Sequence, residues 1–135
     1  GKIGAVNSSV DSGVAAGDPF VVDHMVIPRV HKQILSAING TTEIDKINAV
    51  GVLEYFGIAS AIIGADAAAK AAQVDLIQVR LGTGLGGKAY VSFTGDVSAV
   101  EQSLKAGANT GKDSGMLFNK VMISSPDKEV FATLL

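Results

Sequence analysis

The glycine-rich stretch from Leu81 to Lys88 has the residue types and spacing that could do chemistry. Gly82, Gly84 and Gly87 satisfy the G-x-G-x-x-G pattern of dinucleotide-binding loops. The same stretch also satisfies the phosphate-loop pattern G-x-x-x-x-G-K. Both kinds of loop bind phosphate with backbone N–H groups at the start of a helix, so a helix must follow directly.

The residues after this loop favour a hairpin over a phosphate site. Residues 88–94 alternate as a strand does, and Ala89 stands where a phosphate loop needs Ser or Thr to bind magnesium. One interpretation is a structural hairpin in which glycine supplies positive φ angles. In a second interpretation, the backbone amides of the hairpin and Thr83 line an opening at the axis of a ring-shaped oligomer.

Other candidate chemistry is sparse. His24 and His31 are the two histidines, and neither lies at a usual metal-ligand spacing from a pair of carboxylates. The serines lack any Ser-His-Asp context. The chain has no Cys, which excludes disulfides, thiolate zinc sites and iron–sulfur ligation by this chain. We therefore predict no catalytic residue and no metal site.

The composition favours association between copies. The 135 residues are 47% hydrophobic and 18% charged, with a formal net charge of -2, whereas about 25% charged residues is usual. The near-neutral balance argues against nucleic-acid binding. The longest apolar run, 56–65, is shorter than the roughly 20 residues that span a membrane. The low charge indicates surface buried against other subunits, and a tight Ala/Gly-rich core is the alternative explanation.

The sequence contains an internal repeat. Residues 1–6 align with residues 95–100, and residues 31–35 align with residues 127–131. The glycine spacing between these segments is shared as well. Both copies follow the order helix, strand, helix, with the first strand expected at 20–27, and this order argues against chance similarity.

The phase of the repeat sets the expected domain organisation. Residues 48–94 match nothing earlier in the chain, so residues 48–135 form one complete unit. Residues 1–40 are then the C-terminal part of a preceding unit, and residues 41–47 are the linker. We expect the natural protein to contain the missing start of the first unit.

Hydrophobic periodicity predicts the elements of the complete unit. The expected strands are 49–56, 74–80, 88–94 and 116–123, and the expected helices are 58–72, one capped by Asp96, and one over 126–134 that starts at its proline. Asp66 and Lys70 form an i,i+4 pair on the first of these helices. The order βαββαβ plus a C-terminal helix predicts an α+β fold of the ferredoxin-like, split βαβ type.

Four stretches of this unit resemble the bacterial microcompartment (BMC) shell proteins, the hexagonal tiles of carboxysome-like and metabolosome shells. Residues 49–54, 65–76 and 95–100 are similar to strand and helix signatures of the family. Residues 80–84, Arg-Leu-Gly-Thr-Gly, resemble the pore-loop pattern Lys-Ile-Gly-Ser-Gly. Residues 26–31, Val-Ile-Pro-Arg-Val-His, resemble the edge motif Pro-Arg-Pro-His. The layout is closest to the tandem-domain, propanediol-utilisation type, which forms trimeric pseudohexamers, with the first BMC domain truncated at its N-terminus.

The resemblance implies roles for individual residues. It places Lys70 at the tile edge, with Arg29 inserted across the same boundary and His31 in the edge motif. In the second unit Ser-Ser-Pro-Asp replaces that motif at 124–127, so alternate edges should differ in chemistry. The implied pore loop consists of Arg80, Leu81, Gly82, Thr83, Gly84, Leu85, Gly86, Gly87 and Lys88.

These features together predict a non-enzymatic shell protein of a cytoplasmic microcompartment. We expect a homotrimer that contacts other shell proteins at its edges, that can contact encapsulated enzymes, and that passes small metabolites through its pore. Some relatives hold an iron–sulfur cluster through a Cys of the first domain's pore loop; this chain has no Cys, so we expect no cofactor held by it. The alternatives are a ferredoxin-like trimer that senses a small molecule and a nucleotide-binding enzyme.

The nucleotide alternative has a direct test. A thermal-shift screen with ATP and NAD should leave the unfolding midpoint unchanged, because a strand follows the glycine-rich loop. A saturable stabilisation of several degrees by either nucleotide would overturn the hairpin interpretation.

Overall fold

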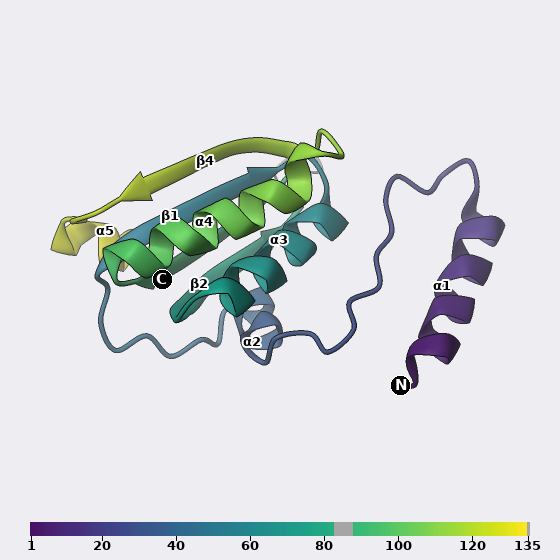
Figure 1. Cartoon of the computed structure of the whole chain (residues 1–135), viewed down its shortest axis with the longest axis horizontal. Coiled ribbons are helices and arrows are strands. Elements are labelled where there is room, and N and C mark those ends of the chain that lie inside the picture. Colours follow the sequence, from purple (N-terminus) through teal and green to yellow (C-terminus); the bar gives the residue numbers. More distant parts are fainter. Residues whose placement is uncertain (83–87, 135) are drawn as a thin grey trace.

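A four-stranded antiparallel sheet forms the centre of the computed structural model, which describes residues 1–82 and 88–134 (Figure 1). The strands, in the sheet order β2-β3-β1-β4, are β2 (Val74–Leu81), β3 (Ala89–Gly95), β1 (Ala49–Tyr55) and β4 (Leu117–Ile123). The helices are α1 (Ile3–Gly17), α2 (Gln33–Asn39), α3 (Ile58–Ala71), α4 (Val97–Lys112) and α5 (Lys128–Leu134). Since β3 pairs antiparallel with both β1 and β2, the unit β1-α3-β2 is a split βαβ. The element order expected for the complete unit is confirmed.

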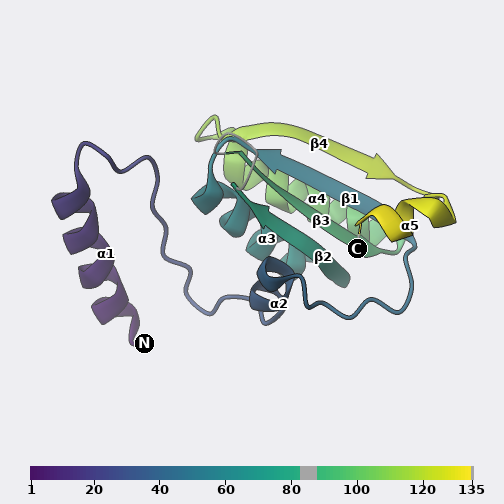
Figure 2. The ribbon, with the colours of Figure 1, turned by 180° about the vertical axis from the view of Figure 1, so that it is seen from behind.

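Helices α3 and α4 cover one face of the sheet (Figures 1 and 2). Small side chains make this contact close: Ala61, Ala65 and Ala68 of α3 are fully buried. The Ser103 hydroxyl of α4 donates a hydrogen bond to the Ala68 carbonyl at 2.9 Å, which ties the two helices together. The tight alanine-rich core that was the alternative explanation of the low charge is therefore present in α3.

Tyr55, at the end of β1, fixes the spacing of the two helices. Its side chain is fully buried, and its hydroxyl donates a 2.7 Å hydrogen bond to the carbonyl of Gly107 on α4. A Cβ at Gly64 of α3 would overlap this hydroxyl, and a Cβ at Gly107 would lie 3.0 Å from the Gly64 carbonyl oxygen. The two helices can therefore cross over the tyrosine only with glycine at both positions.

The start of α4 was predicted correctly from the sequence, whereas the start of α5 was not. Asp96 stands at the N-cap of α4, as expected, but its side chain makes no capping hydrogen bond; its backbone carbonyl accepts the Val100 N–H at 2.9 Å. The closing helix does not start at Pro126, however, but at Lys128. The Asp127 side chain accepts the Glu129 N–H at 3.1 Å, so this aspartate supplies the first hydrogen bond and the proline stays outside the helix.

The expected strand at 20–27 is wrong. This segment is extended, but within the described residues it forms no strand ladder. A strand needs a neighbour for its backbone hydrogen bonds, and residues 20–27 run past the start of α3 instead of beside a strand. Every side chain of α1 is exposed or half-buried, and the helix stands apart from the sheet in both views (Figures 1 and 2).

Replacing Gly64 by Ala should destabilise the protein by about 1–3 kcal/mol, because overpacking against the rigid Tyr55 ring exceeds the helix-propensity gain of up to about 1 kcal/mol. The matched control is Gly13→Ala in α1, where a Cβ would meet nothing within 4 Å. Urea unfolding of both variants measures the difference, and equal midpoints would show that the Tyr55 contact does not limit the helix spacing.

The same tyrosine predicts a loss of stability at high pH. Burial raises the pKa of Tyr55 to about 12, although a side-chain hydrogen bond with Thr110 opposes this shift. The stability contributed by the neutral phenol is complete below the ordinary tyrosine pKa of about 10 and is lost as the pH rises through 12. Tyr55→Phe cannot ionise, so its urea midpoint should fall less between pH 9 and pH 12 than that of the wild type. Parallel pH profiles would contradict the assignment.

Candidate functional site

The hairpin between β2 and β3 closes at the base of the predicted pore loop. Leu81 pairs with Ala89, and the Gly82 N–H donates to the Lys88 carbonyl at 3.2 Å. Gly82 has φ +66, a left-handed conformation that favours glycine. Residues Thr83–Gly87 of the predicted loop lie outside the described residues.

A strand, β3, follows this loop. The phosphate-binding motifs need a helix N-terminus at this point, with its unpaired N–H groups directed at the ligand. The observed strand therefore agrees with the hairpin interpretation, and it gives the G-x-G-x-x-G match no helix on which to bind phosphate.

Two phenylalanines hold a lysine beside the base of the hairpin. Phe56 follows β1 and Phe118 lies on β4; their ring centroids are 5.1 Å apart and their planes meet at 76°. The Lys88 ammonium lies 4.4 Å from the Phe118 centroid and 5.8 Å from the Phe56 centroid. Contact with an aromatic face attracts a cation, so the Lys88 charge is held in place. Arg80, also exposed, adds a second positive charge at the end of β2.

The sequence analysis did not assign a role to this aromatic pair. Phe56 and Phe118 are 47% and 49% exposed, and they lie far apart in the sequence. Each follows a predicted strand or lies within one, where an aromatic residue is ordinarily part of the core. Only the pairing of β1 with β4 brings the two rings together.

The predicted edge residues meet through one buried carboxylate. Asp66 of α3 accepts a hydrogen bond from Lys70 Nζ at 2.5 Å and another from the His31 backbone N–H at 2.7 Å. The predicted i,i+4 pair is therefore confirmed. Asp66 also anchors the turn that carries Arg29, whose φ of +55 is unusual for a residue other than glycine. Lys70, Arg29 and His31 thus belong to one corner of the molecule, while the hairpin residues lie at the end of the sheet.

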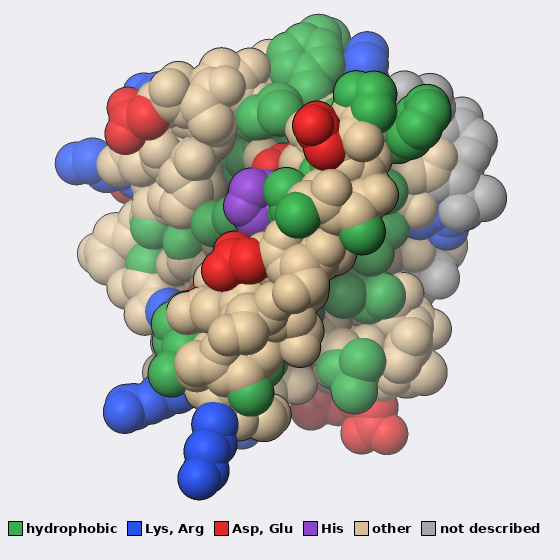
Figure 3. Space-filling model, turned by 90° about the vertical axis from the view of Figure 1, so that its right-hand side faces the viewer, with side chains coloured by type: hydrophobic (Ala, Val, Ile, Leu, Met, Phe, Trp, Pro, Cys, Tyr) green, Lys and Arg blue, Asp and Glu red, His purple; other side chains and the backbone are tan. Residues whose placement is uncertain are grey.

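Apolar side chains are exposed where the N-terminal segment passes α3 (Figure 3). Phe20 and Val22 are each 88% exposed, and Ile58 of α3 is 42% exposed. The Ser60 hydroxyl donates to the Asp23 carboxylate at 3.0 Å, which holds the segment against the helix. A groove of about 780 Å³ runs between the two.

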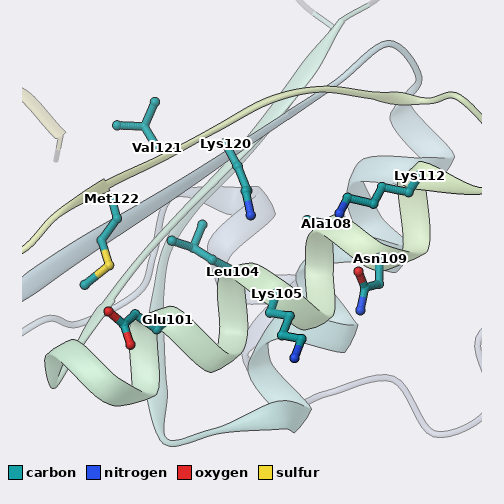
Figure 4. A pocket seen from close by; sticks show the side chains of 9 residues that line it. All are labelled: Glu101, Leu104, Lys105, Ala108, Asn109, Lys112, Lys120, Val121 and Met122. Carbon is teal, nitrogen blue, oxygen red and sulfur yellow. The ribbon is translucent and has the colours of Figure 1, made fainter.

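A second groove, of about 450 Å³, lies between α4 and β4 (Figure 4). Leu104 and Ala108 form its apolar floor, and the ammonium group of Lys120 points toward α4 (Figure 4). Lys105 and Lys112 complete its basic lining. All three lysines are exposed, so water solvates their charges, and the groove by itself indicates no specific ligand.

Neither histidine belongs to a metal-binding cluster in the described part of the chain. There, no group of three or more His, Cys, Asp or Glu side chains lies close enough together to hold an ion. The helices within the same residues are all too short or too polar to cross a membrane.

Comparison with known proteins identifies the family. Residues 49–126 match the BMC domain. The chain is 33% identical over 135 residues to the bacterial microcompartment shell protein PduT of Citrobacter freundii, covering all of this chain and 73% of that protein. It is also similar to the crystal structure of a microcompartment protein from Desulfitobacterium hafniense DCB, with 45% identity and a TM-score of 0.87, over 98% of this chain and 73% of that one. With the β1-α3-β2-β3-α4-β4 fold described above, these matches show that the chain belongs to the BMC-domain family of bacterial microcompartment shell proteins.

Proposed function

We propose that the protein is a non-enzymatic tile of the microcompartment shell, in which three copies form a pseudohexamer. In this assembly the complete unit, 48–135, alternates around a ring with the unit to which residues 1–40 belong. The exposed apolar side chains along the N-terminal segment and the start of α3 support burial against further protein, because surfaces of this kind mark interfaces. The 18% charged composition supports the same conclusion.

The observation that carries this proposal is the corner organised by Asp66. One carboxylate, 6% exposed, holds the ammonium of Lys70 and the backbone of the turn carrying Arg29. The positions of Lys70 and Arg29 are thereby fixed relative to each other. An edge contact that is repeated through a flat layer would require this. Such contacts can be individually weak, because every tile makes several of them.

We further propose that the β2–β3 hairpin contributes to a central pore. Arg80 and Lys88 are exposed at its base, and the Lys88 charge is positioned by Phe56 and Phe118. Rings of fixed positive charge favour the passage of anions. The proposed solutes are therefore small polar or anionic metabolites, and the protein's role is that of a barrier with a selective opening.

The tile predicts a specific effect of Lys70→Ala. Electron microscopy of concentrated wild-type protein should show sheets, tubes or hexagonal arrays, and the variant should show dispersed particles instead. Its free energy of unfolding should fall by about 1–3 kcal/mol, because the buried Asp66 carboxylate loses a charged hydrogen-bond donor, so the particles are compared at a temperature where both proteins are folded.

Lys105→Ala, which removes an exposed lysine from α4, is the matched control and should leave the arrays intact. Discrete trimers at every concentration, with or without Lys70, would contradict the tile and favour the sensor alternative, for which the 780 Å³ groove beside α3 is the available site.

A further inference from the structure

Helix α2 docks on the edge of the sheet through one glutamine. β2 is an edge strand, and the Gln33 side chain takes the place of a neighbouring strand there. Its Oε1 accepts the Leu76 backbone N–H at 3.2 Å, while its Nε2 donates to the Asp75 carboxylate at 2.9 Å. Only an amide can make both contacts, because a carboxylate has no hydrogen to donate.

Two further contacts complete the docking. The His31 N–H donates to Asp66, and α2 buries Ile34 and Ala37, which are 4% and 0% exposed. We call the surface that receives them the β2 seat: Asp66, Asp75, the Leu76 N–H and the apolar surface under Ile34 and Ala37. The seat thus has two acidic groups, one backbone hydrogen-bond donor and an apolar surface that α2 covers.

The C-terminal segment is the repeat counterpart of the segment in this seat. Residues 127–131 align with 31–35, and α5 and α2 both contain seven residues. In this structure the described side chains of α5 are exposed or half-buried, as at Glu129 and Val130. Through its described residues, this second helix therefore fills no seat of the same kind.

The counterpart residues do not fit the β2 seat. The repeat puts Glu129 where Gln33 donates to Asp75. This change brings a carboxylate to a carboxylate and leaves Asp75 without its donor. The Asp66 contact does not discriminate between the segments, because the His31 backbone N–H makes it. The same register puts Thr133 in place of Ala37, which has no exposed surface, so a larger side chain there would have to displace its neighbours.

We infer that the β2 seat is a specificity element: it accepts residues 31–39 of its own chain and rejects the α5 segment of another copy. The unit that receives α5 must instead present a donor, an amide or a basic side chain, at the position of Asp75. Repulsion of the wrong partner keeps the two kinds of unit alternating around the ring. This consequence for the ring rests on the proposed pseudohexamer, whereas the selectivity of the seat does not.

The first test uses the full chain and hydrogen exchange. Gln33→Glu should lower the protection of the α2 amides by about threefold to tenfold, the effect of losing one ordinary, solvent-exposed hydrogen bond, and 1 M NaCl should restore part of it. Adding Asp75→Asn should return protection to near the wild-type level, because the amide that this substitution introduces can donate to the new carboxylate. Gln102→Glu adds the same charge at an exposed site on α4 and should leave α2 unchanged. Loss without rescue by Asp75→Asn would overturn the inference.

The second test asks whether the seat discriminates between segments. In the Gln33→Glu background, Glu129→Gln gives the C-terminal segment the amide that the seat accepts. Sedimentation velocity should then show stronger concentration-dependent association than Gln33→Glu alone. Equal association of the two would contradict the selectivity. A wild type that stays monomeric while the Asp75→Asn rescue succeeds would refute the pseudohexamer and leave the seat chemistry intact.

Discussion

The Tyr55 hydroxyl occupies the point where α3 and α4 cross over the sheet, and the positions of both helices follow from it. Its hydrogen bond to the Gly107 carbonyl joins β1 to α4, and its ring lies where a side chain at Gly64 would be. Burying a phenol without a hydrogen-bond partner would cost about 1–3 kcal/mol. The hydrogen bond to Gly107 and the space left by the two glycines are therefore needed together. The alanines of α3 then reach full burial because the helix is held close to the sheet.

The corner organised by Asp66 depends on this crossing. Asp66 is on α3, and its burial follows from the position of that helix on the sheet. A buried carboxylate needs hydrogen-bond donors. Asp66 finds them in Lys70, one turn along the same helix, and in the backbone N–H of His31, which lies just before α2. One buried acid thus connects the core of the unit to the surface proposed to meet the next tile.

Local sequence patterns were enough to predict the complete unit. The strand-forming residues of β2 and β3, the acid–base spacing of Asp66 and Lys70, and Asp96 before α4 each report a local preference that the structure follows, although burial in β3 does not alternate. The segment at 20–27 has the same apolar character, yet it forms no ladder among the described residues, because strand formation requires a partner and not only a propensity. The start of α5 was misplaced because the Asp127 side chain, rather than the proline, provides the cap.

By itself, the sequence determined the order of elements, the glycine hairpin, the absence of cysteine chemistry and the resemblance to shell proteins, since each of these is written in residue types and short spacings. Tertiary structure alone decided that Phe56 and Phe118 hold Lys88, that Asp66 accepts the His31 backbone N–H, and that Gln33 completes the edge of β2. These contacts join residues separated by long stretches of chain. The packing of helices on the sheet determines which of these residues meet, and a local sequence pattern does not contain that information.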